Sequence, residues 1–273
     1  MTGVAVRQRT IRLLIVLCAA AASAAVIAGQ AARPATPAYK PPKTADGQPD
    51  LQGIWQVRNT ANWDIQSHGS GYRIPSGLGV VEGETIPYQP WAAEKKQQNF
   101  KNRLTDDPVE KCYSAGAPRT MYLPYPVQIL QTPDAVVMVS SYVHTWRWIP
   151  TVATPRYEGY EAWMGDPRGR WEGDTLVVES IGFNGQTWLD HSGNFHSDAL
   201  KLTERFTRTA PDAIGYEVTV DDAKVFTRPW KMRMTMYLRT DLPRVLEDEC
   251  YLDAEEAGKP IRGGHPEDRG SVQ

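Results

Sequence analysis

The sequence has few cysteines, three among 273 residues, and no long run of charge of one sign. Its formal net charge is −2 at pH 7, and a balance of this kind argues against a nucleic-acid partner, because such proteins usually carry clustered positive charge. The sequence also lacks a P-loop, a glycine-rich dinucleotide motif, Cys-x-x-Cys and His-Glu-x-x-His. These absences argue against nucleotide, thiol-redox and zincin chemistry, so we expect no cofactor.

One strongly apolar stretch stands near the N-terminus. Arg7, Arg9 and Arg12 precede the uncharged run Leu13–Ile27, and small residues follow it. This order is typical of a secretory signal peptide, which we place at residues 1–31. A transmembrane anchor is the alternative, but the run is shorter than the roughly 20 apolar residues that span a bilayer. We therefore expect a periplasmic or secreted protein with no stable membrane span after the signal is removed.

Removal of the signal would also remove Cys18 and leave Cys112 and Cys250. An even number of cysteines in an exported protein favours a disulfide between them, and two buried free thiols are the alternative. Between the signal and the first strand, residues 32–50 are rich in proline, alanine and lysine, which predicts a disordered tether. We expect a single β-barrel domain over residues 51–254 and a flexible tail over residues 255–273.

Strand patterns dominate this domain. In Trp230–Arg239, apolar and polar residues alternate, which is the pattern of a half-buried strand. The other predicted strands are Leu51–Arg58, Ala135–Trp148, Thr175–Phe183, Leu200–Arg208 and Ile214–Val220. Short turn-forming connections between the later strands indicate an antiparallel meander. The sequence thus predicts an all-β fold with one short helix at Trp91–Leu104, and it favours a barrel over a sandwich.

Two segments carry resemblances. Gly53-Ile54-Trp55, at the start of the first predicted strand, resembles the first strand of lipocalins and implies a lipocalin-like barrel. The block Trp171–Val178 (WEGDTLVV) resembles a family of exported bacterial proteins of unassigned function. This second resemblance continues through His196–Leu200 and Glu204–Phe206 and implies an exported, β-rich single domain, without implying a reaction.

Four residues are candidates for acid–base catalysis. His196 and Asp198 lie two positions apart in a polar loop, where the carboxylate could orient the imidazole as a base. Glu204 alternates with Leu202 and Phe206, so it faces apolar neighbours, either as an acid or in an ion pair with Arg147 or Arg233. His144 could act as a second acid or base. His191 and His196 could ligate a metal with a carboxylate, but their spacing matches no strong metal motif, so we expect no metal.

Aromatic and basic residues are candidates for ligand binding. The predicted strand Ala135–Trp148 places Tyr142, His144, Trp146 and Trp148 on one face, where rings could stack on a flat or sugar-like molecule. Arg147 and Arg205 could stabilise negative charge. Methionines on the last strand could be core or adapt to a ligand. The predicted ligand-binding residues are Tyr142, Trp146, Arg147, Trp148, Trp188, Arg205 and Met234.

Two functions remain open from the sequence, and a structural envelope protein is a third, weaker option that would leave the polar loop without a role. The first is an exported barrel that binds a small amphipathic, aromatic or sugar-like molecule in an internal pocket. The second is a cofactor-independent lyase, isomerase or hydrolase, which requires His144, His196, Asp198 and Glu204 to meet at one cavity.

Overall fold

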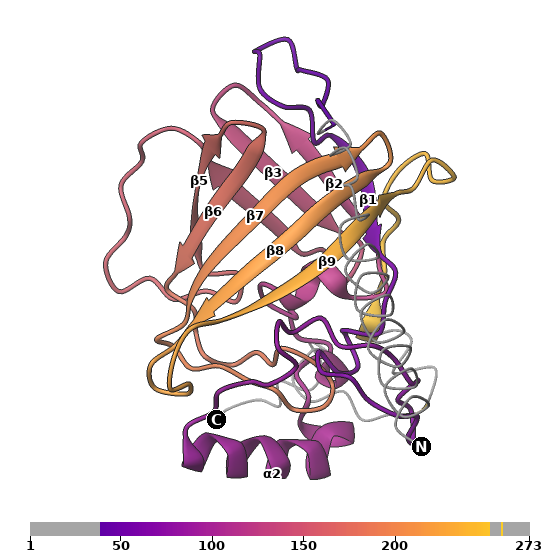
Figure 1. Cartoon of the computed structure of the whole chain (residues 1–273), viewed down its shortest axis with the longest axis vertical. Helices are drawn as coiled ribbons and strands as arrows, with labels where there is room; N and C mark the ends of the chain where they lie inside the picture. The colour runs from indigo at the N-terminus through magenta and orange to yellow at the C-terminus, as the bar shows by residue number, and fades with distance from the viewer. Residues whose placement is uncertain (1–38, 252–257, 259–273) are drawn as a thin grey trace, which may run out of the picture. The chain divides into compact units, whose positions relative to one another are not determined.

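Nine antiparallel strands form one sheet among residues 39–251 and residue 258, which are the residues that the computed structural model describes. Neighbours in the sheet follow the order β4-β3-β2-β1-β9-β8-β7-β6-β5 (Figure 1). The strands are Gly53–Val57 (β1), Val127–Gln131 (β2), Ala135–Ser140 (β3), Trp146–Pro150 (β4), Asp166–Glu172 (β5), Thr175–Ile181 (β6), Lys201–Ala210 (β7), Ala213–Asp221 (β8) and Trp230–Leu238 (β9). The predicted all-β antiparallel fold is confirmed.

The sheet curves into a nearly closed barrel (Figure 1). Its seam lies between β4 and β5, the two ends of the strand order. These edge strands approach closely although they form no ladder within the described chain: a Cβ added at Gly169 of β5 would lie 2.9 Å from Cγ2 of Ile149 in β4. Residues 151–165 connect the two edges along the chain. The predicted barrel is therefore confirmed, and its shape is compatible with a lipocalin-like fold.

Alternation along the strands separates the interior of the barrel from its surface. In β8, buried and partly exposed residues alternate without interruption, and Ile214, Tyr216, Val218 and Val220 are buried. The rings of Tyr216 and Phe206 stack with their centroids 4.7 Å apart. Full burial of a large apolar side chain contributes about 1.5–3 kcal/mol, so these rows of side chains form the main core.

The prediction of one long strand at Ala135–Trp148 is wrong. The chain forms β3, a turn over residues 141–145, and β4, which pairs with β3 through Met138 and Arg147. Val143 and His144 have φ values of 43° and 53°, which no extended strand accommodates. Two further strands were absent from the prediction. β2 is only five residues long, and β5 contains Pro167 and several charged residues in place of an apolar alternation.

A single α-helix among the described residues, α2, spans Pro90–Asp106 and confirms the helix predicted at Trp91–Leu104. Pro90 suits the first turn because its missing N–H would have no partner inside the helix. The helix lies beyond one end of the barrel (Figure 1), where the Asn99 amide donates a hydrogen bond to the Gly193 carbonyl at 3.1 Å. None of the helices in the described ranges has the length and apolar character needed to cross a membrane.

A disulfide joins Cys112 to Cys250, as predicted, with the two Cα atoms 5.5 Å apart. The described part of the predicted tether, residues 39–50, contains a hydrogen-bonded turn in which Gly47 donates to Thr44 and Lys43 forms a bridge with Pro49. The predicted signal peptide at residues 1–31, the rest of the tether and, apart from Gly258, the predicted tail lie outside the described residues.

We expect Gly169→Ala to lower the free energy of unfolding by about 1–3 kcal/mol, because the new methyl group must displace Ile149 at the seam. Gly215→Ala in β8 is the matched control. Its Cβ would meet Thr209 Cγ2 at an ordinary 3.4 Å, so its effect should stay within about 0.5 kcal/mol. Urea denaturation of both variants measures the difference, and equal stabilities would contradict the close contact between β4 and β5.

Candidate functional site

A buried ion pair crosses the interior of the barrel from β4 to β7. The Arg147 guanidinium donates to Glu204 Oε1 from Nη1 at 3.0 Å and contacts Oε2 through Nη2. The Tyr216 hydroxyl also donates to Glu204, at 2.7 Å, and Nη2 of Arg147 donates to Ser180 at 2.8 Å. Burial opposes the charge on Arg147, but the adjacent Glu204 carboxylate outweighs it and raises the Arg147 pKa. Of the two predicted roles of Glu204, the ion pair with Arg147 is present.

The predicted face of Tyr142, His144, Trp146 and Trp148 does not exist, because the first two residues belong to the turn. The Tyr142 hydroxyl donates to the Val109 carbonyl at 2.9 Å, away from the barrel interior. His144 Nε2 lies 2.5 Å from Glu249 Oε1 in an exposed pair. In β4, Arg147 is buried while Trp146 and Trp148 on either side are exposed, so the indoles point outward.

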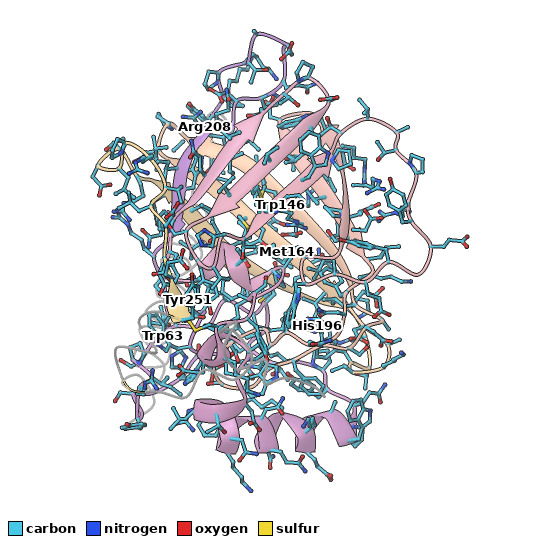
Figure 2. All side chains as sticks on the ribbon, turned by 180° about the vertical axis from the view of Figure 1, so that it is seen from behind. Trp63, Trp146, Met164, His196, Arg208 and Tyr251 are labelled. Carbon is cyan, nitrogen blue, oxygen red and sulfur yellow. A yellow bond between two sulfur atoms is a disulfide. The ribbon has the colours of Figure 1, made fainter. Side chains whose placement is uncertain are left out.

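Four exposed aromatic side chains gather at the seam. Trp146 and Trp148 of β4 are 65% and 49% exposed, and Tyr157 and Tyr160 of the following loop are 79% and 56% exposed. Together with Trp163 and Met164 they line a cavity of about 580 Å³, which we call the aromatic groove. Its polar lining consists of Ser114, His144, Thr145, Arg147 and Asp166. Figure 2 labels Trp146 and Met164 at this groove.

Hydrogen bonds hold the loop that forms the outer wall of the groove. The Ala162 amide donates to the Gly182 carbonyl at 2.9 Å, and the Trp163 ring packs against Tyr113 with centroids 5.6 Å apart. Asp166 forms ion pairs with Arg156 and Arg168 at the start of β5. These contacts hold residues 162–166 in place beside β5 and tie Arg156 to the same segment.

A second cavity, of about 750 Å³, lies between α2 and the polar loop that contains His196 and Asp198. We call it the end cavity. Trp91, Lys95 and Asn99 of α2 line one side, and the opposite side includes two residues that were predicted for the site, Trp188 and His196. His196 is labelled in Figure 2. Asp198 also lines the cavity, so three predicted residues meet there.

His196 and Asp198 do not form the predicted pair. Nδ1 of His196 lies 2.8 Å from the Ser197 carbonyl, and Nε2 lies 2.5 Å from the Thr187 hydroxyl. Since a carbonyl only accepts, Nδ1 carries the proton and Nε2 accepts from Thr187. Burial lowers the His196 pKa and favours this neutral form. Asp198 instead accepts a hydrogen bond from Lys224 Nζ at 2.7 Å on the surface.

The four predicted catalytic residues therefore do not converge. His144 lines the aromatic groove, His196 and Asp198 line the end cavity, and Glu204 is held by Arg147 inside the barrel. Of the remaining predicted ligand-binding residues, Met234 is part of the buried core, and Arg205 pairs with Glu172 at 2.8 Å on the outer surface. Neither of these two lines the groove or the end cavity.

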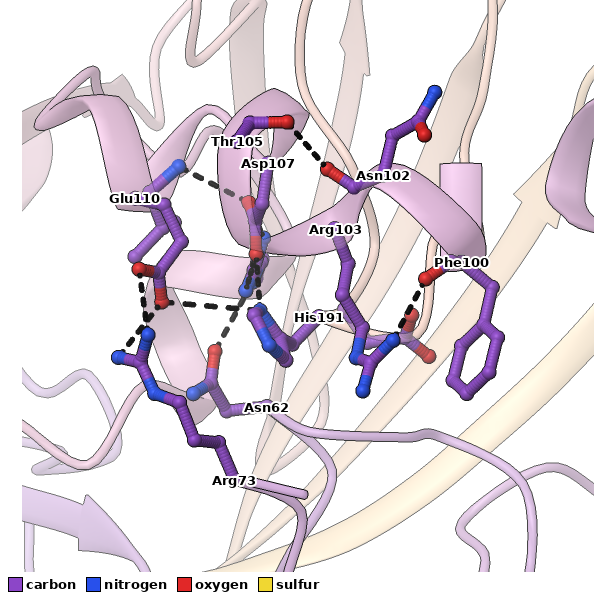
Figure 3. A network of polar contacts seen from close by, with 12 residues as sticks. Asn62, Arg73, Phe100, Asn102, Arg103, Thr105, Asp107, Glu110 and His191 are labelled. Carbon is purple, nitrogen blue, oxygen red and sulfur yellow. Dashed lines mark hydrogen bonds and ion pairs between the residues drawn. The ribbon is translucent and has the colours of Figure 1, made fainter. Parts of the chain in front are cut away.

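A buried polar network that the sequence did not predict lies near α2 (Figure 3). The Asp107 carboxylate accepts two hydrogen bonds from Arg119, at 2.7 and 2.9 Å, and one from Nδ1 of His191 at 2.9 Å. Nε of Arg119 donates to Asn62 at 3.0 Å. Burial acts against the Asp107 charge, but Arg119 and the His191 hydrogen bond lower its pKa to about 2. His191, a possible metal ligand, thus has a structural partner.

No group of three or more His, Cys, Asp or Glu side chains within the described ranges has an arrangement that could hold a metal ion.

Comparison of the chain with models of known protein families, with curated proteins and with solved structures finds no match.

Asp190, next to His191, is a second buried carboxylate without a predicted role. It accepts hydrogen bonds from the Ile65 amide at 2.9 Å and from the backbone and side chain of Asn194 at 3.1 and 2.5 Å. Burial, followed by repulsion from Asp64, outweighs these donors and raises the Asp190 pKa to about 7. The pKa of an unfolded aspartate is 3.8. At a pH between these two values, the folded chain therefore keeps a proton on Asp190 that the unfolded chain has lost.

This difference predicts a pH dependence of stability. Between pH 4 and 7 the unfolded chain releases the Asp190 proton while the folded chain keeps it, so the contribution of Asp190 falls as pH rises, with a slope of up to about 1.4 kcal/mol per unit. Asp190→Asn removes this slope and also lowers stability, because an amide cannot accept all three hydrogen bonds. The measurement is urea denaturation of both proteins at pH 4.5, 5.5, 6.5 and 7.5.

The comparison uses the difference between the two proteins, because other groups titrate in the same range. His196, with its lowered pKa, makes stability rise with pH below about 6.5, but it is present in both proteins. Parallel stability curves for the wild type and Asp190→Asn would show that Asp190 is already ionised at pH 4.5.

Proposed function

We propose that this protein binds a small amphipathic molecule with a flat ring, aromatic or sugar-like, in the aromatic groove. The observation that carries the proposal is the gathering of four exposed aromatic side chains at one cavity. Exposed aromatic residues in one patch are typical of binding surfaces, and binding pockets combine apolar walls with a few polar groups. The groove has this composition.

We place the ligand in the groove and not in the expected internal pocket. The inward-facing residues of the described strands, such as Trp55, Phe206 and Met236, are fully buried and pack into one core. Near Arg147 the described interior leaves a space of only about 10 Å³, no larger than one water molecule needs. A ring-sized molecule fits the groove far better.

We also propose that the protein acts in the periplasm or outside the cell. The apolar run Leu13–Ile27 behind three arginines supports export, as does the disulfide between Cys112 and Cys250, since such bonds persist in oxidising compartments. A ligand that reaches such a protein must itself be present outside the cytoplasm.

Phenyl β-D-glucoside, which carries both an aromatic ring and a sugar, tests the groove. We expect Trp146→Ala and Trp148→Ala each to weaken its binding by about 3- to 10-fold, as the loss of a ring contact of about 0.5–1.5 kcal/mol predicts. Isothermal titration calorimetry measures the Kd. Trp91→Ala in the end cavity is the matched control, because Trp91 is also half exposed, and its Kd should stay within about twofold of the wild-type value.

Two results would contradict the proposal: no binding by the wild type at millimolar ligand, or weaker binding in Trp91→Ala with no change in the two groove variants. The second result would move the ligand to the end cavity. Native mass spectrometry of protein purified from its own cells adds an independent test, because a molecule that co-purifies identifies the natural ligand class.

A second candidate function is hydrolysis in the end cavity, which the Thr187–His196 contact supports. A hydroxyl next to a neutral imidazole, with the imidazole oriented by a third group, is the arrangement of an activated nucleophile. Thr187 Oγ1 would attack an ester carbonyl carbon while its proton passes to Nε2 of His196. The alcohol would leave with that proton, and water would then release the acyl group from Thr187.

Release of p-nitrophenolate from p-nitrophenyl acetate measures this activity. We expect His196→Gln and Thr187→Val each to reduce turnover by about 100-fold or more, because general-base catalysis contributes about 10²–10⁴-fold. Asp198→Asn is the control, since Asp198 lines the same cavity but pairs with Lys224, and its turnover should be unchanged. Wild-type release no faster than in buffer would exclude this candidate for such esters.

A further inference from the structure

The turn between β3 and β4 has a backbone conformation that its residues do not favour. Val143 and His144 occupy the two central positions with φ values of 43° and 53°, and the Thr145 amide donates to the Tyr142 carbonyl at 3.1 Å across the turn. A turn with positive φ at both central positions prefers glycine, asparagine and aspartate, and a β-branched valine is unfavourable there. Such a conformation persists only where contacts with the surrounding structure hold it.

Residues 248–250, which we call the strap, make contacts of this kind. The Val143 amide donates to the Asp248 carbonyl at 3.3 Å. Next to this hydrogen bond, Nε2 of His144 lies 2.5 Å from Glu249 Oε1. The strap therefore contacts both central residues of the turn, one through the backbone and one through the side chain.

The disulfide between Cys112 and Cys250 fixes the strap to the rest of the domain. The non-covalent contacts of the strap with the turn are individually weak, because one is a long hydrogen bond and the other is an exposed ion pair. Cys250 packs against a small cluster of Ala115, Leu123 and Tyr142, which is separate from the main core. A covalent bond between residues 138 positions apart keeps the strap in place when these contacts open.

The turn and both ends of the disulfide lie next to the aromatic groove. Val143, His144 and Thr145 of the turn line the cavity, and so does Ser114, close to the other end of the disulfide. Trp146 follows the turn directly as the first residue of β4. A change in the turn would therefore change the lining of the groove and the position of one of its indoles.

We propose that the disulfide, through the strap, holds the groove in its binding conformation, so that the groove binds its ligand tightly only when the bond is formed. This inference rests on the proposed function of the groove and concerns its control. Both cysteines are partly exposed, so a dithiol can reach the bond. One thiolate of the dithiol attacks a cysteine sulfur and the S–S bond breaks; both cysteines become thiols, and the dithiol becomes a disulfide. Tight binding would thus be confined to an oxidising compartment.

The first test measures the turn without ligand. Reduction of the wild-type protein with dithiothreitol should speed hydrogen exchange at the Val143 and Thr145 amides by at least about tenfold, because the strap and the turn then open together. NMR measures the exchange of single amides. Those of β8, which has a neighbouring strand on either side, are the internal control and should stay protected. Unchanged exchange at Val143 and Thr145 would overturn the inference.

A variant that keeps the disulfide covers the case in which the reduced protein unfolds. Glu249→Gln removes the charge of the pair with His144 and should speed exchange at Val143 by about two- to fivefold, as the loss of an exposed ion pair predicts. Glu172→Gln is the matched control, because it changes an exposed pair with Arg205 on the outer surface and should leave exchange at Val143 unchanged. Equal exchange in the two variants would show that the strap does not hold the turn.

The second test measures the Kd of phenyl β-D-glucoside by calorimetry. We expect reduction to weaken binding at least about fivefold, because only the fraction of molecules with a closed turn binds. The double variant Cys112→Ser, Cys250→Ser should bind as weakly as the reduced protein and should not respond to dithiothreitol.

A change of the two central residues tests whether the disulfide acts through the turn. Val143→Asn with His144→Gly supplies residues that adopt positive φ readily, so the turn keeps its shape without the strap. In this variant, reduction should change the Kd by less than about twofold. If reduction weakens binding as much as in the wild type, the proposed role of the turn is wrong.

The outcomes separate this inference from the proposed function. If the glucoside binds and depends on Trp148, but reduction leaves its Kd within about twofold, the control by the disulfide is wrong and the groove still binds ligand. If the oxidised protein does not bind the glucoside, the proposed function fails, whereas the exchange data still support or overturn the role of the strap.

Discussion

The ion pair between Arg147 and Glu204 determines how the barrel is arranged around β4. Burial of one charged side chain without the other would be strongly destabilising, by about 3–5 kcal/mol, so both must lie inside the barrel together. Because neighbouring residues of a strand point to opposite sides, an inward Arg147 forces Trp146 and Trp148 outward. A shift of β4 by one residue would bury both indoles and expose the arginine. The groove is thus a consequence of the ion pair.

Proline residues explain why the barrel remains open at this place. Pro150 ends β4 and Pro167 lies in β5, and neither has an N–H to donate across the seam. Proline is tolerated in sheets mainly at edges, so a complete ladder between these strands is disfavoured. Gly169 still lets the strands approach, and the loop between them brings Tyr157 and Tyr160 to the opening. Residues 151–165 therefore both cover the edges of the sheet and form part of the groove.

Strands in which apolar and polar residues alternate could be predicted from the sequence, as β7, β8 and β9 show. The turn after β3 could not, because Val143 is a β-branched residue with a positive φ and gives no turn signal. That single error moved Tyr142 and His144 onto the wrong face. The pairing of Glu204 with Arg147 was among the alternatives, since a buried charge needs a partner. The network of Asn62, Asp107, Arg119 and His191 joins segments far apart in the sequence, and no local pattern reports such contacts.

The chemistry of Arg147 accounts for a charged pair where apolar residues would suffice for stability. Replacing a buried ion pair by well-packed apolar side chains is often neutral or stabilising, so the link between β4 and β7 alone does not require charges. Two leucines would pack in the core but would make no hydrogen bond to Ser180 or Tyr216. A guanidinium group donates to both Glu204 and Ser180 with its terminal nitrogens. One side chain thereby joins β4 to two other strands and determines which residues of β4 face outward.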